Sequence, residues 1–186
     1  MGSVFSYNTI TTPVTELIFT QYMSEKQWKK AQYVMVQLHE QNPTHTGYIH
    51  WLGDAYESGF GGGEKSYTNA IEFYTKGIEL GSDRCVASLA WMYGTGSGVE
   101  RDIGRGGKLH IAHLRKTQSP RAIYFYGRYL SRIDADRTRS TYHIQCAASR
   151  GYCDAMKQCA QRYDEGDGCP RDPLKAHTLY TQANLP

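Results

Sequence analysis

Apolar and small residues near the C-terminal end of the chain recur with the spacing of an α-helix. Positions i, i+4, i+5 and i+8 of one stretch are Ala155, Cys159, Ala160 and Tyr163. These positions share one face of a helix, and the small residue at i+5 lets a second helix approach closely. The pattern therefore predicts a helix that packs against a partner helix.

The residues after this stretch predict a tight turn and a second helix. Gly166 and Gly168 can end the first helix, because glycine adopts positive φ angles without steric cost. Asp172 precedes Pro173, which is typical of a helix start: the carboxylate accepts unpaired backbone N–H groups, and proline occupies the first helical position. Asp102 has the same place in an earlier stretch. Together these residues predict a two-helix hairpin.

The hairpin pattern repeats along the chain. A small residue marks the second helix of each copy, and these markers are Ala31, Ala70, Gly106, Ser140 and Ala176. Successive markers are 34 to 39 residues apart, within the roughly 34 to 45 residues that are typical of solenoids built from helical hairpins. In the third copy Leu130 leads directly to Asp136, so the glycine loop has been shortened. The spacing predicts an all-α solenoid.

Two motifs with fixed spacing, Gly98-Val99-x-x-Asp102 and Asp172-x-x-Lys175-Ala176, occur within these copies. They resemble the Sel-one-like repeat family, a branch of the tetratricopeptide-like α/α solenoids, from about residue 44 to the C-terminus. The resemblance implies a right-handed α/α superhelix of about four helix-turn-helix repeats, at approximately 47–83, 84–118, 121–151 and 154–186. In the first repeat Ser66 replaces the family's capping aspartate.

Upstream of these repeats, residues 25–41 carry apolar side chains with a helical period, at Trp28, Ala31, Val34, Met35 and Leu38. Residues 15–23, capped by Thr12, could form the partner helix. We expect residues 1–43 to form an N-terminal segment and a divergent capping hairpin, because a terminal repeat has one face toward water. Residues 44–186 would then form the repeat solenoid, and the whole chain one elongated domain.

Charge and composition exclude several classes of protein. The net charge is +3 and 21% of the residues are charged, and no apolar run reaches the roughly 20 residues that a membrane-spanning helix needs. The first residues have neither the pattern of a secretory signal nor the arginine content of a mitochondrial presequence. We expect an intracellular, soluble protein, cytoplasmic or alternatively mitochondrial. Met1-Gly2-x-x-x-Ser6 matches the N-myristoylation pattern, so Gly2 is a possible lipidation site.

The sequence contains five cysteines, at Cys85, Cys146, Cys153, Cys159 and Cys169. They can be small buried hydrophobic residues, disulfide partners or metal ligands. No Cys-x-x-Cys pair occurs, so we expect no metal site. His110 and His113 could approach one ion but have no further ligand nearby, and we expect them to pack or to face solvent. The resemblance leaves a second possibility open, a mitochondrial respiratory-complex subunit or assembly factor with redox-active or disulfide-bonded cysteines.

Catalytic motifs are not evident. The chain has neither a Gly-x-Ser-x-Gly elbow nor a His-Glu-x-x-His helix, and no Ser/His/Asp set can be selected from its many candidates. The sequence therefore indicates a protein that is not an enzyme and that needs no cofactor. The resemblance also includes bacterial relatives with hydrolase activity of the penicillin-binding kind, which is the least favoured alternative.

The first helices of such repeats line the concave wall of the solenoid, and their outward positions define a candidate groove. The predicted partner-binding residues are Arg84, Trp91, Arg121, Tyr124, Arg128, Arg132 and Lys157. His50, Asp54, Glu57 and Asp154 flank them. Arginine holds carboxylates with two hydrogen bonds, and aromatic residues supply contact area, so this composition favours an acidic peptide segment as ligand.

The function that the sequence predicts is a protein–protein interaction scaffold, adaptor or structural subunit of a larger assembly. Nucleic acid is a poorer candidate for the groove, because acidic residues such as Asp102 and Asp136 interrupt the basic region 101–139 and Glu100 directly precedes it. Membrane association would depend on Gly2 acylation or on a membrane-bound partner.

Overall fold

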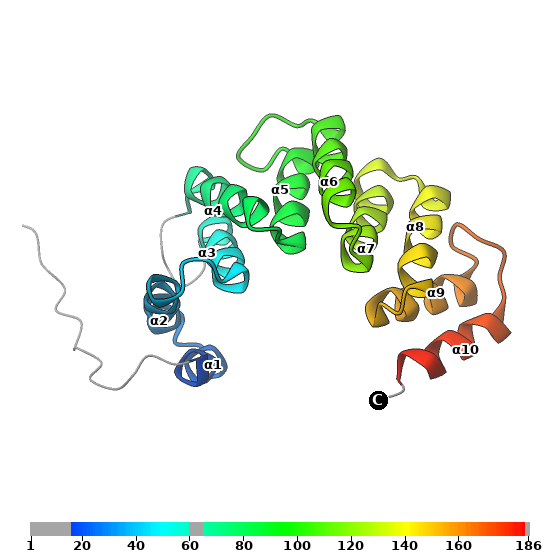
Figure 1. Cartoon of the computed structure of the whole chain (residues 1–186), viewed down its shortest axis with the longest axis horizontal. Coiled ribbons are helices and arrows are strands. Elements are labelled where there is room, and N and C mark those ends of the chain that lie inside the picture. Colours follow the sequence, from blue (N-terminus) through cyan, green and yellow to red (C-terminus); the bar gives the residue numbers. More distant parts are fainter. Residues whose placement is uncertain (1–15, 60–64, 185–186) are drawn as a thin grey trace, which may run out of the picture.

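The computed structural model describes residues 16–59 and 65–184, and this part of the chain is built from helices (Figure 1). Ten α-helices follow one another in these ranges, with one short π-helical segment, η2. They are α1 (Glu16–Ser24), α2 (Trp28–Gln41), α3 (Thr46–Ser58), α4 (Tyr67–Glu79), α5 (Asp83–Thr95), α6 (Ile103–Thr117), α7 (Pro120–Tyr129), η2 (Leu130–Asp134), α8 (Arg137–Ser149), α9 (Cys153–Glu165) and α10 (Pro173–Ala183).

Consecutive helices pack in pairs, and the pairs stack in chain order. The most extensive contacts join α3 with α4, α5 with α6, α7 with α8 and α9 with α10, and each pair also contacts the next. The result is an open arch with α1 and α2 at one end and α10 at the other (Figure 1). The prediction of an all-α solenoid is confirmed.

Polar side chains start most of these helices. Ser66, Ser82, Asp102, Ser119 and Asp172 each accept a hydrogen bond from the backbone N–H three residues later. Each bond satisfies one donor that the first turn of a helix would otherwise leave unpaired. The serine in the place of the family's aspartate therefore still caps its helix.

The small marker residues lie where paired helices are closest. Ala31, Ala70, Ser140 and Ala176 are almost fully buried, and Gly106 of α6 is buried as well. A Cβ atom at Gly106 would lie 2.7 Å from the backbone oxygen of Ala90 on α5. Only a residue without a side chain fits there, which explains why this repeat carries glycine where the others have alanine or serine.

The connection between the two helices of the third repeat differs from those of the other repeats. It lacks the glycine loop, and α7 continues into η2 before Ala135 adopts a left-handed φ of 55°. The hydroxyl of Ser140 on α8 donates to the backbone oxygen of Gly127 on α7, at 2.7 Å, which joins the two helices despite the shortened connection. The shortened loop thus leaves the hairpin intact.

The N-terminal end differs from the sequence prediction in where its second helix begins. The helix expected over residues 25–41 begins three residues later, at Trp28, and Lys26 just before it has a positive φ of 56°. Gly2 and Thr12 lie outside the described residues. The division at residue 43 stays a prediction. In the described part of the chain, no helix has the length and apolar character that crossing a membrane requires.

Candidate functional site

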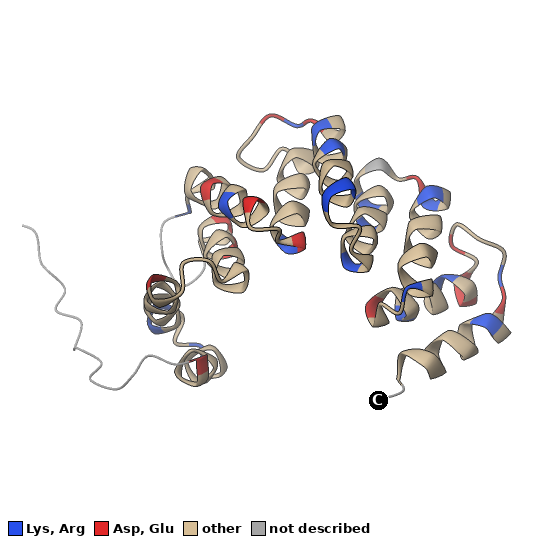
Figure 2. Cartoon of the chain, viewed as in Figure 1, with Lys and Arg blue, Asp and Glu red and all other residues tan. Residues whose placement is uncertain are grey.

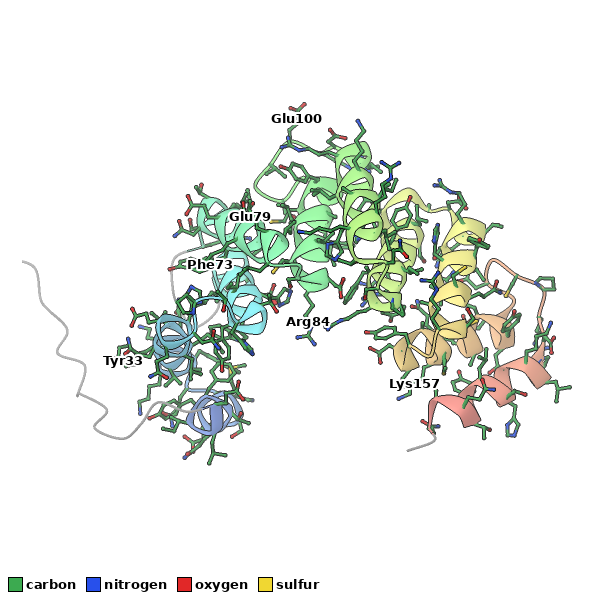
Figure 3. All side chains as sticks on the ribbon, viewed as in Figure 1. Tyr33, Phe73, Glu79, Arg84, Glu100 and Lys157 are labelled. Atoms are coloured by element: carbon green, nitrogen blue, oxygen red, sulfur yellow. The ribbon has the colours of Figure 1, made fainter. Side chains whose placement is uncertain are left out.

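The inner side of the arch carries a pocket with a volume of about 460 Å³. Its walls come from α3, α5 and α7, with contributions from α6, η2 and the start of α9. The pocket therefore crosses three successive repeats near the middle of the solenoid. Figure 3 shows Arg84 on this inner side, and Glu100 on the opposite, outer edge.

Six of the seven predicted groove residues line this pocket: Arg84, Trp91, Arg121, Tyr124, Arg128 and Arg132. Lys157 is exposed on α9 but does not belong to the wall. Three of the four flanking residues, His50, Glu57 and Asp154, also line it. Whether the pocket binds a partner stays a prediction.

The arginines of the pocket are held against aromatic rings. The guanidinium group of Arg128 lies 5.7 Å from the centre of the Tyr124 ring, and that of Arg121 lies 5.7 Å from the centre of the Phe125 ring. Arg121 Nε is buried without a hydrogen-bond partner. A carboxylate that enters the pocket would meet the guanidinium groups of Arg121 and Arg128, and an arginine can hold a carboxylate with two hydrogen bonds.

Burial raises the pKa of the Tyr124 hydroxyl, while Arg128 acts in the opposite direction. The hydroxyl stays protonated near neutral pH and can donate a hydrogen bond to the same anion. Basic residues lie on α6 and α7 and acidic ones on α3, while α4 carries residues of both signs (Figure 2). Within the pocket, Arg84, Arg121, Arg128 and Arg132 form a cationic wall, and Glu57 of α3 lies at an acidic edge.

The acidic edge is organised around Tyr74 of α4. Its hydroxyl lies 2.7 Å from Asp54 Oδ1 and 2.8 Å from Glu57 Oε2, both on α3. Burial raises the pKa of Glu57, the hydrogen bond from Tyr74 lowers it, and the charge of Asp54 raises it further. The two carboxylates thus compete for one hydroxyl proton, and of this trio only Glu57 lines the pocket.

His50 of α3 connects this acidic edge to α5. Its Nε2 lies 3.1 Å from Ser88 Oγ, and its Nδ1 lies 3.4 Å from Asp54 Oδ2. The sequence placed His50 and Asp54 on the inner wall but did not single out Ser88. Ser88 lies one turn after Arg84 and therefore on the same face of α5. This spacing was sufficient to predict Ser88 as a groove residue.

The two other histidines of interest pack inside the solenoid. His110 is 2% exposed beside Tyr126 and Tyr129, and His113 Nε2 lies 2.7 Å from Asp83 Oδ1. Of the two predicted roles, packing and facing solvent, the structure shows packing. In the described residues, no group of three or more His, Cys, Asp and Glu side chains is placed to hold a metal ion.

All five cysteines are free thiols. Cys85 and Cys159 are buried, and burial raises the pKa of each thiol to about 11. A thiol with such a pKa is almost entirely protonated at neutral pH and reacts slowly. These two residues therefore behave as small core residues.

The fold and its inner pocket define an α/α solenoid of the helical-repeat class. The family model described as Sel1 repeat matches four segments, 48–82, 85–110, 120–152 and 153–184. The chain belongs to this family. No curated protein matches the sequence.

Solved structures with the same fold include three bacterial proteins. A Sel1 repeat protein from Oxalobacter formigenes is 20% identical with a TM-score of 0.55, over 90% of this chain and 70% of the other. The immunity protein Pa5087 from Pseudomonas aeruginosa is 20% identical with a TM-score of 0.57, over 92% and 66%. The protective antigen c5321 from uropathogenic Escherichia coli is 21% identical with a TM-score of 0.51, over 91% and 41%. At these identities the likeness shows the fold alone.

Proposed function

We propose that this protein is an interaction module that binds an acidic segment of a partner protein in the inner pocket. The observation that supports this most directly is that four arginines, Arg84, Arg121, Arg128 and Arg132, line one pocket. Arginine binds a carboxylate with two parallel, charge-assisted hydrogen bonds, so this lining favours an acidic ligand.

The size and lining of the pocket indicate how such a segment would bind. Its volume of about 460 Å³ lies within the range of about 300–1,000 Å³ that is typical of ligand pockets. It accommodates one or two side chains, so the rest of the segment would run along the inner side of the arch. Trp91 is 39% exposed in the pocket wall and would supply an aromatic anchor. As such a module the chain would act as an adaptor or as a subunit of a larger assembly.

The test is selection from a displayed library of random twelve-residue peptides, followed by affinity measurement on the enriched sequences. We expect enrichment of Asp and Glu, and loss of binding by about a hundredfold in the double variant Arg121→Glu/Arg128→Glu. Arg115→Glu/Lys116→Glu is the matched control, because it reverses the same number of charges at exposed positions of α6 outside the pocket. Equal weakening by both variants, or enrichment of neutral peptides, would contradict the proposal.

A further inference from the structure

Ser88, His50 and Asp54 form a chain of polar contacts at the wall of the inner pocket. Ser88 Oγ lies 3.1 Å from His50 Nε2, and Asp54 Oδ2 lies 3.4 Å from His50 Nδ1. Ser88 and His50 both line the pocket. A hydroxyl next to a base that is itself oriented by a third group is the arrangement that activates a nucleophile.

The surroundings fix the roles of the two histidine nitrogens. Asp54 Oδ2 lies near Nδ1, and its negative charge favours the tautomer with the proton on Nδ1, which leaves Nε2 able to accept the Ser88 proton. The Asp54 carboxylate is held in turn by the Tyr74 hydroxyl, which donates to Oδ1 at 2.7 Å. Asp54 is therefore a positioning residue, and His50 is the base.

The surroundings of His50 lower the pKa of its imidazole, so the ring is neutral and able to accept a proton near pH 7. Burial lowers the pKa of its imidazole, Asp54 raises it, and Arg84 and Arg121 lower it. Of the other groups on the packed elements, the Tyr74 ring lies 6.0 Å from the imidazole and Glu57 lines the same pocket. The imidazole is neutral at pH 7 as a result.

We propose that Ser88 is a nucleophile that takes up acyl groups from esters or thioesters carrying a carboxylate, with His50 as its base. This goes beyond the binding of a partner segment and does not depend on it. Arg84 and Arg121 select the anionic acyl group, and their positive charges favour the negative oxygen that develops during attack.

The proposed steps conserve atoms and charge. Ser88 Oγ bonds to the acyl carbon while its proton moves to His50 Nε2. The bond from the acyl carbon to the alcohol or thiol then breaks, and the leaving group takes that proton from His50. Water attacks the acyl-serine ester, with His50 accepting one proton, and the acid leaves as Ser88 regains its hydrogen. No oxidant, reductant or cofactor is needed.

The first experiment uses diisopropyl fluorophosphate, which forms a bond from serine oxygen to phosphorus and releases fluoride. Intact mass and peptide mapping of the full chain should show one adduct, on Ser88. Ser88→Ala should abolish it and His50→Gln should slow it by about a hundredfold. Ser149→Ala, at an exposed serine of α8, is the matched control and should label like the parent chain. Circular dichroism melting curves establish that the variants fold.

Two outcomes overturn the proposal: no adduct on Ser88, or an adduct on Ser88 that forms equally fast in His50→Gln. Asp54→Asn tests the positioning role through the pH dependence of the labelling rate, which a purely structural change would not shift. Because the Asp54 charge raises the pKa of His50, its removal should shift the inflection of the labelling rate to lower pH as well as reduce the maximum rate. A lower rate with an unmoved inflection contradicts the positioning role.

The preference for a carboxylate is tested separately with two chromogenic esters. Mono-para-nitrophenyl adipate, whose carboxylate is too far from the ester to attack it readily, should release nitrophenolate faster than para-nitrophenyl acetate after the rate without protein is subtracted, with an initial burst of about one equivalent per chain. Equal rates, or a faster reaction with the acetate ester, overturn the assignment of the substrate class. Failure of all these reactions would leave peptide binding by the same pocket unaffected, so the two proposals are distinguishable.

Discussion

The Tyr74 hydroxyl oxygen lies 2.8 Å from Glu57 Oε2 and 2.7 Å from Asp54 Oδ1. A phenol has a single proton to donate. When both carboxylates are ionised, one of them faces a lone pair instead of a hydrogen. The trio is therefore most stable when one carboxylate holds a proton, and the raised pKa of Glu57 identifies which one.

This relationship predicts a pH-dependent effect of Glu57→Gln. The pKa of Glu57 is higher in the folded chain than in the unfolded chain. The contribution of protonated Glu57 to the stability of the fold is therefore fully present below the unfolded pKa and is lost as pH rises through the folded pKa. The neutral amide avoids that loss. At pH 7 we expect Glu57→Gln to melt at a higher temperature than the parent, by about 2–4 °C for each kcal/mol gained in the free energy of unfolding. At pH 4 the variant and the parent should melt at the same temperature. The exposed Glu79→Gln is the control, and a gain that persists at pH 4 would contradict the mechanism.

The buried imidazole of His110 predicts a stability change of opposite sign. Burial lowers its pKa to about 3, with a smaller contribution from the charge of His113. The unfolded chain therefore binds more protons than the folded one between about pH 6.5 and 3. The contribution of neutral His110 to the free energy of unfolding is complete above that pH window. It declines as pH falls through the window, by about 1.4 kcal/mol per pH unit at most.

His110→Phe keeps an aromatic ring beside Tyr126 and Tyr129 but cannot take up a proton. Urea denaturation at pH 4, 5, 6 and 7 should therefore show a smaller decline in the free energy of unfolding for this variant than for the parent. The exposed His177→Gln should follow the parent. Parallel curves for the parent and His110→Phe would show that this histidine is not the titrating group.

The sequence was sufficient to predict the helices and their pairing, because both follow from local spacing. Ala155, Cys159 and Ala160 are buried on α9 as the periodicity requires. Arg162 shows the limit of that reasoning. Its residue surface is only 3% exposed, although the sequence alone predicts a surface position for an arginine here. Its partners Thr141 and Ser131 come from the preceding repeat, so only the packing of one repeat on the next reveals why it is buried.

The same limit applies to the candidate site. The inner-wall positions of α5 and α7 could be listed from the helical period, and six of the seven chosen residues surround one pocket. Lys157 is not among them, because the pocket ends at Tyr152 and Asp154, near the start of α9. The contact between His50 and Ser88 joins two repeats across 38 positions of sequence, and local spacing carries no information about it.

Arg162 itself supplies the next prediction. Its guanidinium donates to the hydroxyls of Thr141 and Ser131 and lies 4.0 Å from Asp167 Oδ2. Arg162→Ala removes these bonds and leaves a cavity, so we expect a loss of about 2–4 kcal/mol in the free energy of unfolding. Arg171→Ala, at an exposed position of the following loop, should change it by less than about 0.5 kcal/mol. Similar losses in chemical denaturation would contradict the structural role of Arg162.

Two adjacent glycines on α6 predict opposite responses to one substitution. A Cβ at Gly106 would overlap the Tyr129 hydroxyl and lie 2.7 Å from Ala90 O, whereas a Cβ at Gly107 would meet nothing nearer than 3.9 Å. Alanine favours a helix over glycine by about 1 kcal/mol. Gly107→Ala should therefore raise the melting temperature and Gly106→Ala should lower it. Both variants rising would mean that α5 and α6 can separate freely at this point.

The cysteines predict an order of reactivity that bears on the redox alternative. Cys153 is exposed, Cys146 and Cys169 are partly exposed, and Cys85 and Cys159 are buried with pKa values near 11. Because the thiolate is the reactive form, a disulfide reagent such as dithiobis(nitrobenzoate) should modify Cys153 first, and Cys85 and Cys159 only at the rate of unfolding. Denaturation without reductant should then expose five titratable thiols. A count of three or one, restored to five by reductant, would show disulfides in the native protein and favour an assembly factor with redox-active cysteines.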